Sequence, residues 1–387
     1  MSLDPAIARR VDELLEEHPP SSTDPTDFLG TRFDAGLAWV HYPEGCGGLG
    51  ADPEQHRLVV ERLNAAGAPS NFSRNPIALG MVGPTIARHG TEAQRVRYLR
   101  RLFTCEDIWC QLFSEPGAGS DLAGLATRAV RDGDEWVVNG QKVWTSLGHK
   151  ANHGLLLART DIDAPKNRGI TAFLVDMHAP GVDVRPLRQM TGDAEFNEVY
   201  LDDVRLPPDA QLGPEGAGWQ VATTTLMNER VSIGSAMATM ASPGATAVDV
   251  YRKRERRDPV ARDRVVRMWI ESEVGRIMNA RAAQLGQTGD PGPVGSVGKL
   301  FTAEHALRAH ELIIDLLGAE GMLYPTFGPD GAPTERTHHV AFLRSRANTI
   351  EGGTSEVMRN ILGERVLGLP RDDHGPKDRP WRDIPRN

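Results

Sequence analysis

The sequence predicts an α+β multidomain protein with an N-terminal helical domain, a middle β-barrel or sandwich and a C-terminal four-helix bundle. Apolar residues recur at helical spacing from about residue 5 to 105, and again from Gly218 to about Leu369. Between these regions, short alternating segments are joined by Asp-Gly and Asn-Gly, which are strong hairpin signals. The changes of pattern place the domains at 1–105, 106–212 and 213–370, followed by a flexible tail at 371–387.

The N-terminal region is expected to form helices separated by Pro- and Gly-rich stretches such as 41–50. One helix is predicted over 51–66, where Leu58, Val59 and Leu63 have helical spacing. Another begins after Thr91, because a threonine before an apolar helical pattern is a favourable N-cap.

The middle region is expected to be all-β. Its predicted strands span 108–113, 127–130, 136–138, 142–146, 154–158, 170–175, 182–187 and 197–201. Two predicted turns carry the hairpin dipeptides, Asp-Gly at 132–133 and Asn-Gly at 139–140.

The C-terminal region predicts a helical bundle. Long helices are expected at 219–241, 258–284, 296–317 and 354–368. Pro370 ends the last of them, because proline cannot continue a helix. The residues beyond it are charged and Pro-rich, which is typical of a loose tail.

Composition excludes several classes of function. The 387 residues carry a formal net charge of −8, which argues against general nucleic-acid binding. No run reaches the roughly 18 apolar residues of a membrane span. The first residues lack the apolar core of a secretory signal, so a cytoplasmic protein is expected. His149 and His153 lie in a β-rich stretch without nearby ligands, and no metal site is predicted.

One glutamate lies on an otherwise apolar helical stripe. The stripe consists of Trp219, Ala222, Leu226, Glu229, Ile233 and Met237. A carboxylate in an apolar pocket has a raised pKa, which suits a general base near neutral pH. The alternative is that Glu229 lies at the helix edge and pairs with the adjacent Arg230.

Two Gly-rich segments are candidate ligand contacts. Residues 111–121 form a loop in which backbone N–H groups and small hydroxyls can approach a ligand, although an ordinary tight loop fits equally well. Gly352 and Gly353 precede a helix whose first N–H groups favour an anion. Thr354 and Ser355 are equally suited to act as plain helix caps.

Three collinear motifs resemble the acyl-CoA dehydrogenase family. They are Ser-Glu-Pro-Gly-Ala-Gly-Ser-Asp at 114–121, Asn-Gly-Gln-Lys-Val-Trp-Thr-Ser at 139–146 and Gly-Thr-Ser-Glu at 353–356. The resemblance covers about 45 to 370 and is greatest to members with the catalytic glutamate on the first bundle helix.

The resemblance implies FAD bound between the β domain and the bundle, with a neighbouring subunit completing the pocket. The cofactor contacts that it implies are Phe113, Ser114, Ser120, Trp144, Ser146, Arg256, Thr354 and Glu356. Arg256 stands for a basic cluster at 252–257, which fits a solvated patch equally well. Ser120 and Arg230 are the expected substrate contacts.

The resemblance also implies the base. Many members carry it at the position of Gly352, which has no side chain. Others carry it on the first bundle helix, where this chain reads Asn-Glu-Arg-Val from Asn228 and offers Glu229. Glu351, one residue out of register, is the rival.

The implied reaction is α,β-dehydrogenation of an acyl-CoA to the 2-enoyl-CoA. A flavin ribose hydroxyl and a backbone N–H polarise the thioester, Glu229 removes the α-proton, and the β-hydride passes to flavin N5. An electron-transfer flavoprotein is the expected oxidant, and the protein is expected to be a homo- or hetero-oligomer, as a dimer or tetramer. No nucleic-acid partner is expected.

Two departures leave other functions open. Asp315 and Ala319 stand where many members have a glutamine and a glycine that contact a neighbour's FAD. The alternatives are a non-catalytic or partner subunit of a hetero-oligomeric enzyme, or a flavin oxygenase on the same fold. Small residues on the Glu229 helix indicate room for a branched, long or polycyclic acyl group; they are Gly234, Ser235, Ala236 and Ala238.

Overall fold

The computed structural model divides the chain into two compact units. The first contains Met1–Pro186, Glu195–Asn228 and Pro376–Asn387, and the second contains Leu187–Ala194 and Glu229–Gly375. The structure describes residues 2–239, 242–254, 258–288, 294–324, 326–328, 331–335, 337–371 and 378–384, without the side chains of 230–239, 282–288 and 294. No helix among these residues is long and apolar enough to cross a membrane.

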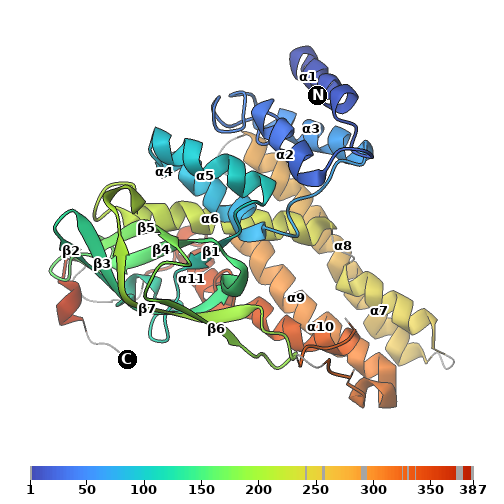
Figure 1. Cartoon of the computed structure of the whole chain (residues 1–387). Coiled ribbons are helices and arrows are strands. Elements are labelled where there is room, and N and C mark those ends of the chain that lie inside the picture. The colour runs from blue at the N-terminus through green and yellow to red at the C-terminus, as the bar shows by residue number, and fades with distance from the viewer. Residues whose placement is uncertain are drawn as a thin grey trace. The chain divides into compact units, whose positions relative to one another are not determined.

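The N-terminal part of the first unit is helical, as the sequence predicts (Figure 1). Its helices are α1 (Pro5–Glu17), α2 (Pro25–Asp34), α3 (Pro53–Ala65), α4 (Gly83–His89) and α5 (Glu92–Thr104). Aspartate caps and first-turn prolines begin α1, α2 and α3. Thr91 caps α5 in a capping box with Gln94, so its predicted role is confirmed.

The middle of the chain forms an eight-stranded sheet within the first unit's sequence range. The strands are β1 (Trp109–Leu112), β2 (Arg128–Asp132), β3 (Glu135–Ser146), β4 (His153–Arg159), β5 (Ile170–Asp176), β6 (Val182–Leu187), β7 (Phe196–Leu206) and β8 (Gln211–Leu212). Their order is β6-β7-β3-β2-β4-β5-β8, and β1 pairs in parallel with β4. The predicted turn at Gly133 joins β2 to β3.

The turn predicted at 139–140 is wrong. The strand β3 runs through both residues, and the pairing of β3 with β7 shows an irregularity between Val138 and Gly140. A Cβ atom at Gly140 would lie 2.4 Å from Thr127 Oγ1. The glycine is therefore required for close approach of two strands and a bulge, not for a hairpin.

A shared apolar core joins the helices and the sheet of the first unit. It contains Leu99 of α5, Trp109 of β1, Leu155 of β4 and Val221 of α6 (Gly218–Thr239). Within this unit, the hydroxyls of Thr85 and Thr225 also lie 3.0 Å apart. The first turns of α6 are thus fixed to the N-terminal helices and strands.

The second unit is a helical bundle organised around α9 (Val294–Leu317). It also contains α7 (Pro243–Arg252), α8 (Pro259–Thr288), α10 (His338–Ser345) and α11 (Ser355–Arg365), each of which contacts α9. Buried residues of α7, α8 and α9, including Val250, Met268 and Ile313, form its core. The short helices α7 and α10 were not predicted.

Residues 378–384 differ from the expected flexible tail. Trp381 is buried, its Nε1 donates to Gly124 O at 3.3 Å, and the Arg159 guanidinium lies 4.6 Å from its ring centroid. This segment therefore packs on the β region of the first unit.

Candidate functional site

The first candidate half-site is the Gly-rich loop after β1. Phe113 is buried, Ser114 is half-buried and Ser120 is exposed. The carbonyl oxygen of Ser114 accepts a hydrogen bond from Val143 N at 2.9 Å, which places the start of the loop beside β3. The backbone groups of Glu115 and Ala118 bond to each other in both directions and close a tight turn.

A buried ion pair holds this loop. Lys142 Nζ donates to Glu115 Oε1 at 2.7 Å and to Phe113 O at 3.0 Å. Glu115 also accepts from the backbone N–H groups of Ala126 and Thr127. Burial lowers the pKa of Lys142 to about 8, although Glu115 opposes this shift. Burial raises the pKa of Glu115, but Lys142 and the hydrogen bonds outweigh it, so this pKa is lowered. Both groups therefore favour a fixed, charged pair.

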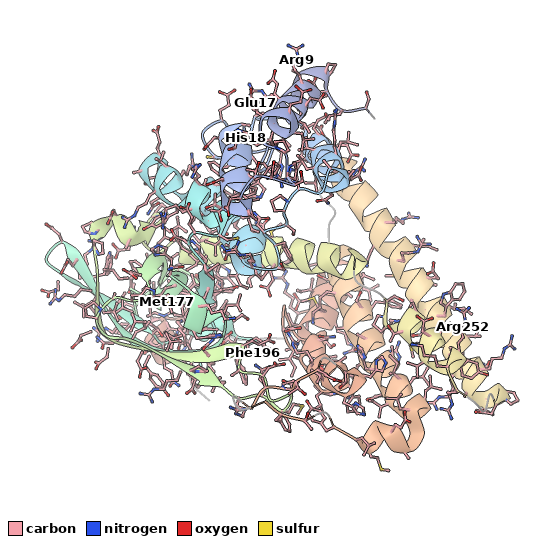
Figure 2. All side chains as sticks on the ribbon, turned by 45° about the vertical axis from the view of Figure 1, so that its right-hand side comes forward. Arg9, Glu17, His18, Met177, Phe196 and Arg252 are labelled. Carbon is pink, nitrogen blue, oxygen red and sulfur yellow. The ribbon has the colours of Figure 1, made fainter. Side chains whose placement is uncertain are left out.

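Trp144 lies next to this loop in an unusual conformation. Its φ angle is 60°, in the left-handed region, and its side chain is 61% exposed. The ring meets that of Phe196, labelled in Figure 2, edge to face at 6.1 Å, and Ser146 follows as a half-buried residue. A strained backbone costs about 1–3 kcal/mol and is concentrated at ligand sites. An exposed indole held in this way is suited to stack on a flat ligand.

The second candidate half-site is the N-terminus of α11. Gly352 and Gly353 have φ angles of 64° and 94°, and the Thr354 side chain accepts from Val357 N at 3.1 Å. A cavity of about 470 Å³ opens here. Its lining residues are Glu304, Leu307, Arg308, Thr349, Ile350, Thr354, Ser355, Glu356 and Arg359. The structure thus brings the predicted contacts Thr354 and Glu356 to one cavity.

Ser355 distinguishes this cavity from an ordinary capped helix end. The residue is 4% exposed, and its Oγ has no hydrogen-bond partner among the described residues. A buried hydroxyl without a partner is costly, because it has lost its hydrogen bonds to water. Together with the first-turn N–H groups of α11, it favours a polar or anionic ligand group at this position.

Glu229 lies on α6, in the second unit, and is half-buried. Its charge interacts with the ammonium of Lys299 on α9. On the predicted stripe, Ala222 is fully buried and Trp219 and Leu226 are partly buried against the first unit's core. The side chains of Arg230, Ile233 and Met237 lie outside the described residues, so the Glu229–Arg230 pair and Arg230's substrate role stay predictions.

The rival base Glu351 is tied to an arginine. Arg344 Nη1 and Nη2 donate to the two carboxylate oxygens of Glu351 at 3.2 and 2.9 Å. A bidentate guanidinium stabilises the carboxylate form and occupies both oxygens. This geometry makes Glu351 a poor acceptor for a substrate proton.

The structure describes part of the basic cluster at 252–257, and it describes Asp315. Arg256 lies outside the described residues, while Arg252, on α7 (Figure 2), is exposed with its guanidinium 4.0 Å from Asp249. The sequence suggests that the negative charge of Asp315 would disfavour an anionic ligand. In the structure this carboxylate pairs with a guanidinium, because Arg264 Nη2 donates to its Oδ2 at 2.7 Å. The charge of Asp315 is therefore balanced within the bundle.

Sequence reasoning missed the charged residues that support these loops. They are Glu115, Lys142, Arg264, Lys299 and Arg344. For Lys142 and Glu115 a signal was present, because both lie inside the motifs that were recognised. For the bundle residues the only signal was helical spacing, which does not identify partners on other helices.

Family models match three consecutive parts of the chain. The N-terminal domain of acyl-CoA dehydrogenases matches residues 4–106, the middle domain 110–204 and the C-terminal domain 216–367. Together these matches extend over most of the sequence.

Curated relatives agree with the family models. Acyl-CoA dehydrogenase FadE34 of Mycobacterium tuberculosis is 41% identical over 87% of this chain, which spans only 45% of that protein's length. Acyl-CoA dehydrogenase IpdE1 of the same organism is 40% identical over 88% of this chain and 87% of its own length.

Solved structures share the fold. The Tcur3481-Tcur3483 steroid ACAD has a TM-score of 0.75 at 27% identity, covering 96% of this chain and 100% of that chain. The ChsE4-ChsE5 complex from Mycobacterium tuberculosis has a TM-score of 0.70 at 29% identity, with the same coverage.

Proposed function

The chain belongs to the acyl-CoA dehydrogenase family, a family of flavoprotein oxidoreductases, and we propose that it oxidises an acyl-CoA thioester to the 2-enoyl-CoA with Glu229 as the base. The observation that carries the proposal is the bidentate pairing of the rival carboxylate: both oxygens of Glu351 accept hydrogen bonds from Arg344, and Glu351 also interacts more strongly than Glu229 with the Lys299 ammonium. Glu229 is half-buried on α6. Removal of the α-proton by Glu229 leaves an enolate-like thioester, from which the β-hydride departs.

The described residues fit FAD as the acceptor. In the first unit, the exposed indole of Trp144 offers a stacking surface, and Phe113, Ser114, Ser120 and Ser146 surround its loop. In the second unit, Thr354, Glu356 and the Ser355 hydroxyl, which has no partner within the described part of the chain, line the cavity at the α11 N-terminus and suit polar groups of a nucleotide. When bound, FAD supplies the hydride acceptor at N5.

Burial and a nearby charge both affect the proton affinity of the Glu229 carboxylate. A half-buried carboxylate is partly desolvated, which raises its proton affinity and suits it to accept a carbon-bound proton. The charge of the Lys299 ammonium interacts with that of Glu229, and a cation near a carboxylate favours its ionised form.

We propose a bulky, polycyclic acyl group as the substrate class. One solved relative is the Tcur3481-Tcur3483 steroid ACAD, and this chain is similar to it over nearly its whole length. In the sequence, the small residues Gly234, Ser235, Ala236 and Ala238 follow Glu229, and their size indicates room for such a group.

A hetero-oligomer is the proposed assembly. Two structural relatives, the Tcur3481-Tcur3483 steroid ACAD and the ChsE4-ChsE5 complex, carry paired names. The helix α8 carries an exposed apolar stripe, formed by Val266, Trp269, Ile270, Val274 and Ile277, which is typical of a surface that another chain covers. An electron-transfer flavoprotein is the proposed oxidant.

A second candidate function is a non-catalytic partner subunit. Asp315 and Ala319 favour it, because they differ from the residues expected beside a neighbour's FAD. The Arg264–Asp315 pair weakens this argument, since it balances the added charge. A flavin oxygenase is the remaining alternative on this fold.

Anaerobic titration of the purified protein with an acyl-CoA panel tests the proposal. We expect a bound-flavin visible spectrum that bleaches with a steroid-like acyl-CoA and less with short straight-chain substrates. A flavin that no acyl-CoA bleaches would contradict dehydrogenation. A colourless protein that gains flavin only with a second subunit would favour the partner-subunit function.

A further inference from the structure

One lysine joins the two ends of the turn that precedes α11. Lys299, on α9, is half-buried, and its Nζ donates to Asn348 O at 2.8 Å and to Gly353 O at 2.7 Å. The two carbonyl groups belong to residues five positions apart, with Glu351 between them. Such a bridge fixes the path of the whole turn, since both of its ends bond to one cation.

The same ammonium interacts electrostatically with three carboxylates from three elements. Burial lowers the pKa of Lys299, while Glu351 of the turn, Glu229 of α6 and Glu356 of α11 each raise it. Glu351 has Arg344 of α10 as a second cation, and Glu356 lines the cavity at the α11 N-terminus. On α9 itself, Glu304 pairs with Arg359. Lys299 is therefore a cation that interacts with both Glu229 and the turn.

We propose that Lys299 is a positioning residue for the dehydrogenation: it pins the 348–353 turn through its two hydrogen bonds and brings a positive charge to the surroundings of Glu229. The inference rests on the proposed function for the role of Glu229, but the bridge to Asn348 and Gly353 is independent of it. Lys299 does not transfer a proton in this scheme. It acts through the turn and through its charge.

Two consequences separate this role from a merely structural one. A cation near a carboxylate lowers the carboxylate's pKa, so removing the charge raises the pH at which Glu229 becomes a competent base. Loss of the two hydrogen bonds frees the turn, so its amide groups exchange faster with solvent. A structural lysine would give the second effect without the first.

The test compares Lys299→Met, Lys299→Arg and, as a control, Lys150→Met, which removes an exposed lysine of the β region. The first readout is kcat/KM against pH for the acyl-CoA that bleaches the wild-type flavin. We expect the acid limb to move up by about one pH unit in Lys299→Met, to stay near wild type in Lys299→Arg and to be unchanged in Lys150→Met.

The second readout is hydrogen–deuterium exchange of peptides that cover residues 348–353, with flavin bound. We expect at least tenfold faster exchange in Lys299→Met and no change in Lys150→Met. An unchanged acid limb in Lys299→Met overturns the charge role, and unchanged exchange overturns the bridging role. A wild-type protein that oxidises no acyl-CoA defeats the proposed function, while the exchange measurement still decides whether Lys299 pins the turn.

Discussion

Two Gly-rich loops, one in each compact unit, are each held by a lysine that donates to backbone carbonyl groups. In the first unit, Lys142 is fully buried and completes an ion pair with a nearly buried Glu115. In the second, Lys299 is half-buried and bonds to Asn348 O and Gly353 O. The first loop is therefore fixed by a charge pair with almost no solvent, and the second by a cation that other carboxylates share.

The different burial of the two lysines determines how much free energy is lost when each cation is removed. A buried pair is expensive to break, because the remaining charge stays without a partner in a poorly solvated environment. A half-buried cation can be removed at lower cost, because water partly replaces it. The buried pair therefore keeps the first loop rigid. The lysine of the second loop instead contributes a positive charge that acts on the base candidate Glu229.

The largest effect expected is on stability, in Lys142→Met. The variant leaves the Glu115 carboxylate buried without its cation, so we expect a loss of about 3–5 kcal/mol in the free energy of unfolding. Urea denaturation followed by circular dichroism measures it. The double variant Lys142→Met, Glu115→Gln should regain part of this loss, because it removes the unpaired charge and keeps an acceptor for the N–H groups of Ala126 and Thr127. A single variant as stable as wild type would show that the pair does not hold the loop.

A smaller effect is expected for Trp144→Ala, on cofactor affinity. Removing an exposed ring that stacks on a flat ligand should weaken flavin binding about tenfold, while the apoprotein's stability changes little because the ring is 61% exposed. Fluorescence titration of the apoprotein with FAD checks this, with Trp144→Phe as the control that keeps a ring. Equal affinity in all three proteins would remove Trp144 from the flavin site.

The second loop should tolerate loss of its arginine better than the first loop tolerates loss of its lysine. Arg344 and Glu351 are 34% and 39% exposed, so we expect Arg344→Met to cost about 1 kcal/mol or less. Urea denaturation under the conditions used for Lys142→Met gives the comparison. A loss as large as that of Lys142→Met would mean that the two loops do not differ in the way described.

The smallest effect is expected at Asp315→Asn. Its pair with Arg264 is exposed on both sides, and such pairs contribute about 0.2–1 kcal/mol. We expect the free energy of unfolding of the variant to fall by an amount near the lower end of that range, and we expect the variant to retain its flavin. Flavin retention measured by absorbance after gel filtration checks this. Tighter flavin binding in the variant would show that Asp315 disfavours the cofactor in the wild-type assembly.

Much of the fold was predictable because its signals are local. Helical spacing and the Asp-Gly turn predicted the order of helical, β and helical regions, and the family models confirm the family and enzyme class that the motifs predicted. The Asn-Gly dipeptide at 139–140 led to the wrong prediction of a turn. A hairpin turn and a bulge at a close strand contact both require glycine, so the dipeptide alone does not distinguish them. Short helices such as α7 carry too few turns to show a clear period.

The candidate site was predictable only in part. Motifs identified Trp144 and Thr354. The backbone strain at Trp144 and the lack of a partner for the Ser355 hydroxyl among the residues that the structure describes depend on tertiary structure. The ion pair of Lys142 with Glu115 joins residues 27 positions apart, and a hydropathy pattern places both on the surface. Long-range pairs of this kind leave no periodic signal.

The central claim is that Glu229 is the base, and anaerobic rapid mixing of acyl-CoA with Glu229→Gln and Glu351→Gln tests it most directly. Flavin absorbance reports the rate of hydride transfer, and the spectrum before mixing controls for flavin content. We predict a rate about 10²–10⁴-fold below wild type in Glu229→Gln and a rate within a few-fold of wild type in Glu351→Gln. A wild-type rate of flavin reduction in Glu229→Gln, together with a strongly lowered rate in Glu351→Gln, would contradict the account and assign the base to Glu351 in the turn.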